Sequence, residues 1–107
     1  MNTKEIAQLL IELRCASMEV YSNPSESNYR SLINKYSIIF AGEKFNKINS
    51  LELCHHIVTS FGTSIESDKF HNLLLNACNE LNMKYEPLSK MSDLLNPTPF
   101  CYYIDLW

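Results

Sequence analysis

Residue types that bind metals or attack substrates gather in the second half of the chain, at Cys54, His55, His56, His71 and Cys78. On a helix, His71 and Cys78 would share one face because they lie two turns apart. His55 and His56 are neighbours and would point about 100° apart, so they cannot both face that side. No spacing typical of a zinc site is present. We therefore expect surface histidines and buried thiols, with no metal and no cofactor.

Signatures of catalysis are missing from the sequence. Cys54 could act as a nucleophile only with a base within hydrogen-bonding reach, and no pattern in the chain supplies one. The chain has no glycine-rich phosphate loop, no serine elbow and no metalloprotease helix. We expect a protein that is not an enzyme.

Three carboxylates, Glu5, Glu12 and Glu19, recur at intervals of seven residues. Seven residues are close to two helical turns, so these side chains would form a line along one edge of a first helix. One interpretation is a solvated helix face, which is common. The other is half of an interface that speeds and selects the encounter with a basic partner.

The segment Phe100–Trp107 is almost entirely apolar or aromatic and follows Asn96-Pro97-Thr98-Pro99, which cannot continue a helix. It packs across the helices as part of the core, pairs as a strand, or forms an interface, since Tyr and Trp dominate binding hot spots. In an extended tail, alternate side chains face opposite ways. We expect the apolar set to face inward, namely Phe100, Tyr102, Ile104 and Leu106. The more polar set is expected to face outward, namely Cys101, Tyr103, Asp105 and Trp107.

The elements that must position these residues are predicted to be helices, since the chain has only two glycines. Apolar residues at helical spacing, with capping residues at the ends, define four helices. They run from Thr3 to Tyr21, from the Asn23-Pro24-Ser25-Glu26 cap to Gly42, from the Asn49-Ser50-Leu51-Glu52 cap to Gly62, and from Thr63–Asp68 to about Met83. Leu88–Leu95 is expected to form a short helix or helical turn. Ser37–Phe40 has strand propensity, but the longer helical period outweighs it.

The composition is that of an ordinary globular protein: 107 residues, 46% hydrophobic and 20% charged. We predict an all-α fold, with residues 1–107 forming a single-domain bundle of four to five helices and a docked aromatic C-terminal tail. The four cysteines contain no CxxC pair and each lies in or beside an apolar run, which favours reduced core thiols. No stretch is long enough to cross a membrane and no signal peptide is evident, so we expect a cytoplasmic protein that does not bind membranes.

The formal net charge of −3 is unevenly distributed. The basic side chains of the middle, Arg30, Lys35, Lys44 and Lys47, lie between two acidic segments. An acidic chain with one basic stretch favours a basic protein partner over a nucleic acid.

At class level the chain resembles the small all-helical immunity proteins that bacteria use against toxins in contact-dependent growth inhibition and related competition systems. The shared features are its size, the acidic stretches Glu5–Glu19 and Glu80–Asp105, an Asn-, Ser- and Tyr-rich surface and the lack of catalytic motifs. The resemblance implies tight binding to a basic toxin, often a nuclease, with acidic and aromatic residues blocking its active-site cleft.

Two functions follow as expectations. The first is an immunity protein that inhibits a toxin, with Glu5, Glu12, Glu19, Tyr103, Asp105 and Trp107 as the candidate partner-binding residues. The alternative is a homo-oligomeric helical adaptor or regulatory domain, in which the tail is exchanged between subunits.

Overall fold

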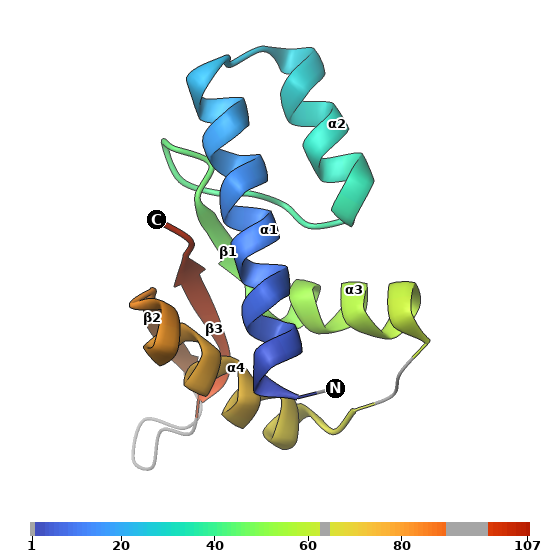
Figure 1. Ribbon diagram of the computed structural model, residues 1–107, viewed down its shortest axis with the longest axis vertical. Helices are drawn as coiled ribbons and strands as arrows, with labels where there is room; N and C mark the ends of the chain where they lie inside the picture. The colour runs from blue at the N-terminus through green and yellow to red at the C-terminus, as the bar shows by residue number, and fades with distance from the viewer. Residues whose placement is uncertain (1, 63–64, 90–98) are drawn as a thin grey trace.

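The computed structural model describes residues 2–62, 65–89 and 99–107, and shows four helices and three strands (Figure 1). The helices are α1 (Thr3–Ser22), α2 (Glu26–Tyr36), α3 (Ser50–Phe61) and α4 (Ser67–Leu81). The strands are β1 (Lys47–Asn49), β2 (Lys84–Ser89) and β3 (Pro99–Asp105).

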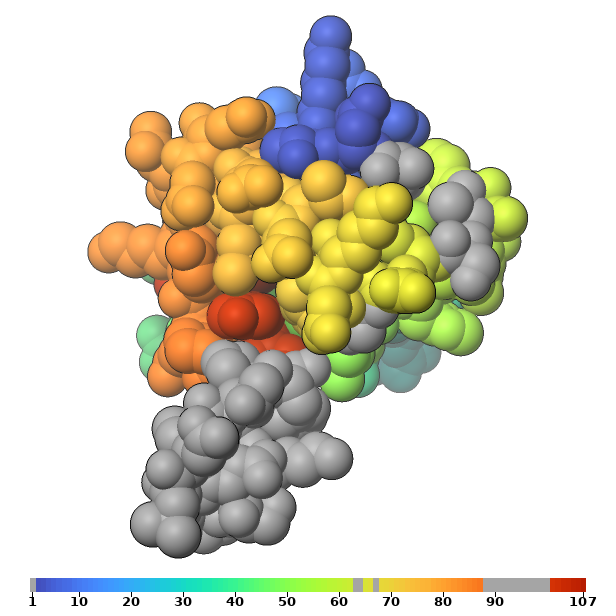
Figure 2. Space-filling model, turned by 90° about the horizontal axis from the view of Figure 1, so that it is seen from below, coloured from blue at the N-terminus to red at the C-terminus, as the bar shows by residue number. Residues whose placement is uncertain are grey.

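The prediction of an all-α bundle is wrong, because the three strands form an antiparallel sheet in the order β1-β3-β2. Helices α3 and α4 contact the sheet, α1 packs on α4, and α2 packs on α1. Figure 1 shows α1 and α4 in front of the sheet. From below, atoms of α4 lie between the start of α1 and a small exposed area of β3 (Figure 2). The fold is therefore a mixed α/β layer structure.

The aromatic tail is the central strand of this sheet. Ile104 of β3 lies opposite Ile48 of β1 on one side and Tyr85 of β2 on the other. A strand paired on both sides has its backbone hydrogen-bonding groups satisfied within the fold. The expectation of a tail docked on a complete bundle is corrected accordingly: it is an integral part of the sheet.

One face of the sheet contributes to the hydrophobic core. Ile48 and Ile104 are fully buried on that face, which α3 and α4 cover. The helices add fully buried residues of their own, among them Ile6, Leu10 and Leu13 of α1, Leu53 and Ile57 of α3, and Phe70 and Leu74 of α4. The opposite face of the sheet carries Lys47, Asp105 and Lys84 in one row and Asn49, Tyr103 and Glu86 in the next.

The prediction that side chains of the tail face alternately inward and outward is correct in part. Ile104 and Leu106 are buried, as predicted. Cys101, predicted to face out, is also buried, and its sulfur lies 3.7 Å from the amide nitrogen of Asn49. A register irregularity between Leu88 and Ser89 of β2 falls opposite this end of β3. Phe100 lies at the irregularity, and its side chain is outside the described residues.

Local capping signals located α1 and α3 well. The side chain of Asn49 accepts the backbone N–H of Leu51 at 2.8 Å, as the capping pattern predicts. Gly62 ends α3 with a φ of 63°, in the left-handed region. α1 begins at Thr3, as predicted, and its N-cap is Asn2, whose side chain accepts the N–H of Glu5.

The second helix is shorter than predicted. Ser25, one residue before the helix, is the N-cap in place of Asn23, and α2 ends at Tyr36, well before Gly42. Ser37 adopts a left-handed conformation, after which Ile38 and Phe40 are fully buried while Ile39 between them is exposed. This alternation is that of extended chain, so the β-propensity of the segment prevails over its helical spacing.

The fourth helix begins at Ser67, within the predicted start Thr63–Asp68, and ends at Leu81, two residues before Met83. Leu88 belongs to β2, so the short helix predicted from Leu88 is wrong at its start, and its remainder, residues 90–95, lies outside the described residues. Within the described part of the chain, no helix combines the length and the hydropathy needed to span a bilayer.

Candidate protein-binding site

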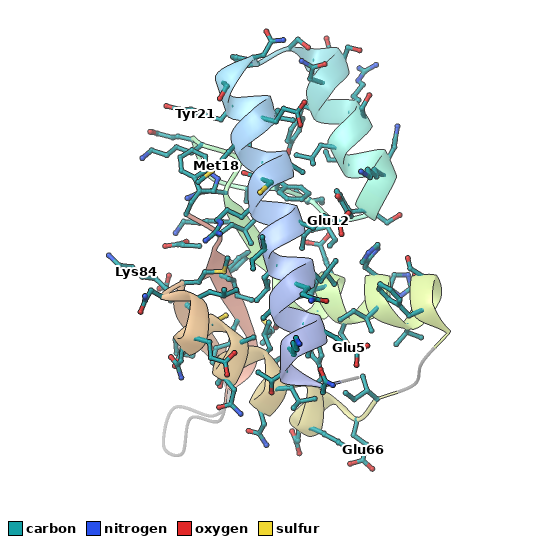
Figure 3. All side chains as sticks on the ribbon, viewed as in Figure 1. Glu5, Glu12, Met18, Tyr21, Glu66 and Lys84 are labelled. Carbon is teal, nitrogen blue, oxygen red and sulfur yellow. The ribbon has the colours of Figure 1, made fainter. Side chains whose placement is uncertain are left out.

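The predicted acidic line lies on the surface of α1. Glu5, Glu12 and Glu19 are all exposed, and Glu5 and Glu12 point to the same side of the helix in Figure 3. From the helical rise, the line spans roughly 21 Å. None of the three forms an ion pair with a residue that the structure describes. We call this set the acidic edge.

A hollow of about 200 Å³ lies between the first half of the acidic edge and the end of α3. It is lined by Glu5, Gln8, Leu9, Glu12 and Phe61. The ring of Phe61 is 55% exposed, which is unusual for a side chain of this size. The hollow thus combines two carboxylates with exposed apolar surface.

Glu12 is held in place by a neighbouring helix. Its Oε1 accepts a hydrogen bond of 2.9 Å from the hydroxyl of Tyr36, which is only 3% exposed. Burial, with the hydrogen bond to Glu12 and its negative charge, raises the pKa of Tyr36 to about 12. The tyrosine therefore stays neutral and donates to the carboxylate throughout the physiological pH range.

A second hollow, of about 300 Å³, lies between α1 and α2. Its polar lining comes from Glu19, Asn23, Asn28 and Ser31, and its apolar lining from Ala16, Val20 and Leu32. The backbone carbonyl of Asn23 accepts the side-chain N–H of Asn28 at 2.8 Å. This lining suits a long side chain with an apolar stem and a cationic end.

The tail residues predicted to bind the partner lie elsewhere. Tyr103 and Asp105 are half-buried on the face of the sheet opposite the helices. Asp105 forms an ion pair of 3.5 Å with Lys47, directly across the strand pair. The structure does not bring these two residues together with the acidic edge: Tyr103 lies on the sheet, and Asp105 lines a hollow with Arg14 and Met18 of α1.

Trp107 was expected to face outward, yet it packs against the core. Its indole Nε1 donates to the hydroxyl of Ser17 at 3.0 Å, and Ser17 donates to the carbonyl oxygen of Phe45 at 2.6 Å. The ring lies 5.2 Å from that of Tyr21. These contacts hold Trp107 against α1, apart from the acidic edge.

No family model, curated protein or solved structure matches this chain.

The five candidate metal ligands of the sequence analysis, two cysteines and three histidines, do not converge. His56 packs edge-on against Tyr36 and Phe61, whereas His71 lies at the other end of α3, beside Ser50. Burial raises the pKa of the Cys78 thiol to about 11 and also raises that of Cys54, so both are poor nucleophiles at neutral pH. Among the described residues, no group of three or more His, Cys, Asp or Glu side chains could hold a metal.

Sequence reasoning missed the pair Ser50 and His71, whose Oγ and Nε2 are 2.9 Å apart. The same hydroxyl accepts the backbone N–H of Tyr102 at 2.9 Å. Such a pair resembles a nucleophile with its base. However, Ser50 is fully buried, so a substrate cannot reach it. The contacts join α3, α4 and β3, and no local motif links residues so far apart in the chain.

Proposed function

We propose that this protein is a non-catalytic binding protein whose acidic edge binds a basic protein partner. We further propose, in line with the resemblance to immunity proteins, that the partner is a toxin domain whose active-site cleft is blocked by the complex. The observation that supports this function best is the acidic edge itself, with three exposed carboxylates that no described cation neutralises.

The shape of the surface supports the same proposal. Two hollows flank the acidic edge, one at Glu5 and Glu12 and one at Glu19. Exposed Phe61 offers the apolar contact that stable interfaces need beside their charges. A helix edge of roughly 21 Å fits within a standard interface, which buries roughly 800 Å² on each partner.

The test begins with the protein encoded by the adjacent gene, which the proposal expects to be a basic toxin domain. Its affinity is measured for the wild type and for the triple variant Glu5→Gln, Glu12→Gln, Glu19→Gln. We expect the triple variant to bind at least about 100-fold more weakly, since each charged contact is worth roughly tenfold. The difference should shrink as salt is raised.

A matched control is the triple variant Glu43→Gln, Glu80→Gln, Glu86→Gln, which removes the same charge from exposed positions elsewhere. It should bind within a few-fold of the wild type. Equal weakening of both variants would mean that overall charge, and not the acidic edge, attracts the partner. A neighbouring gene without a basic or toxin-like product would remove the main support for the toxin.

A further inference from the structure

A third hollow, of about 340 Å³, lies on the side of α1 away from the acidic edge. Its lining includes Arg14 and Met18 of α1, Met83 just before β2, Lys84 at the start of β2, and Leu106 and Trp107 after β3. Figure 3 shows Met18 and Tyr21 on one side of α1, toward Lys84, and Glu5 and Glu12 on the other. We call this hollow the basic pocket.

The side chains that line the basic pocket carry more positive than negative charge. Arg14 and Lys84 form no ion pair with any residue that the structure describes. The acid in the lining, Asp105, is already paired with Lys47 at 3.5 Å. Lys44 adds a further cation, since its Nζ lies 5.5 Å from the centre of the Trp107 ring. Two unpaired cations in one hollow favour an anion.

The apolar part of the basic pocket is rigid. Leu106 is 1% and Met83 6% exposed, so both are fixed by the core. Trp107 is held at its Nε1 by the buried hydroxyl of Ser17. Met18, by contrast, is 40% exposed at the rim, where its flexible thioether can close on a bound ring. Leu106, Met83 and Trp107 would therefore lose little side-chain entropy on binding.

We propose that the basic pocket binds a small organic anion that carries an aromatic ring. The ring lies against Trp107 and Met18, and the carboxylate or sulfonate is bound by Arg14 and Lys84. The volume is within the range of small-molecule sites. Since this pocket and the acidic edge lie on opposite sides of α1, the small molecule and the proposed protein partner can bind together.

Trp107 is the single tryptophan of the chain, so its fluorescence reports on the pocket directly. The probe is anilinonaphthalene sulfonate, an aromatic anion that accepts energy from tryptophan. We expect saturable quenching of Trp107 with one site per chain. Arg14→Gln and Lys84→Gln should each weaken binding about tenfold, the loss expected for one charge-assisted contact. Each variant tests the proposal by itself. Neither Arg14 nor Lys84 is fully buried, so each substitution should leave the fold intact.

The matched control is Lys69→Gln, an exposed cation of α4 that does not line the pocket, and it should bind the probe like the wild type. Uncharged phenylnaphthylamine should bind much more weakly than the sulfonate. Equal affinity for the two probes, or equal affinity of the Arg14→Gln and Lys69→Gln variants, would overturn the proposal. Binding at several sites per chain without quenching of Trp107 would overturn it too, by placing the probe on exposed apolar residues such as Phe61.

Discussion

The buried residues Ser17 and Tyr36 each use a side-chain hydroxyl to hydrogen-bond a neighbouring element of the fold. Ser17 connects α1 with the chain end and with the turn before β1, through Trp107 and Phe45. Tyr36 connects α2 with α1 through Glu12. Neither residue stands out in the sequence, because serine is mostly exposed in proteins and tyrosine is intermediate in burial.

Ser17→Ala should lower the free energy of unfolding by about 1–3 kcal/mol, because it leaves the indole N–H of Trp107 and the carbonyl of Phe45 without partners. Urea denaturation measures the loss. Ser22→Ala makes the same change of residue type at an exposed position of α1 and should shift stability by less than about 0.5 kcal/mol. Equal effects of the two substitutions would contradict a bridging role for Ser17.

Tyr36 gives a pH dependence with a defined sign. Its pKa is about 12 in the folded protein against an ordinary value of 10.0, so between pH 10 and 12 the unfolded chain loses this proton while the folded chain keeps it. Stability should therefore fall as pH rises through this window, by an amount on the order of 1–3 kcal/mol.

The comparison with Tyr36→Phe isolates this contribution from the other tyrosines and lysines that titrate there. The wild type should lose more stability than the variant between pH 10 and 12, as followed by urea denaturation at each pH. If stability falls equally in the two proteins between pH 10 and 12, Tyr36 does not contribute to the pH dependence.

At the scale of elements, the tail Phe100–Trp107 contributes the central strand of the sheet and is not a segment docked on a helical bundle. Deleting residues 100–107 removes most of β3, and with it the pairing of both β1 and β2. Among the described strands, β1 and β2 pair only with β3, so without it neither has a partner strand. We therefore expect the truncated chain to lose its cooperative thermal transition. Circular dichroism and calorimetry measure this directly.

The control at this scale is Tyr103→Ser, which changes a half-buried residue on the face of the sheet opposite the helices. This variant should keep a cooperative transition at a somewhat lower temperature. A truncated chain that still unfolds cooperatively would mean that the tail is dispensable, as the bundle prediction had it.

At the scale of the whole molecule, the apolar tail finds its strand partners within its own chain and needs no second copy. β3 has partners on both sides, and its neighbour β2 carries Pro87, a residue that discourages pairing at a sheet edge. We expect the protein to sediment as a monomer at micromolar concentration. A stable dimer would favour the alternative of a homo-oligomeric adaptor with exchanged tails, which stays a prediction here.

The molecule also separates residues that the sequence grouped by type. The six predicted partner-binding residues fall on three surfaces: the acidic edge of α1, the face of the sheet with Tyr103, and the basic pocket, which Asp105 and Trp107 both line. Only the acidic edge could be predicted as a unit, because seven-residue spacing on one helix is a local property.

The sequence by itself determined the parts of the fold that depend on near neighbours. α1 and α3 follow from helical spacing and from caps such as Asn49 and Gly62, whose hydrogen bonds or backbone angles involve residues a few positions away. Tertiary structure decided the rest. Phe100–Trp107 becomes a central strand only because β1, from the middle of the chain, and β2 both lie beside it. The periodicity within a segment contains no information about strand partners so distant in the sequence.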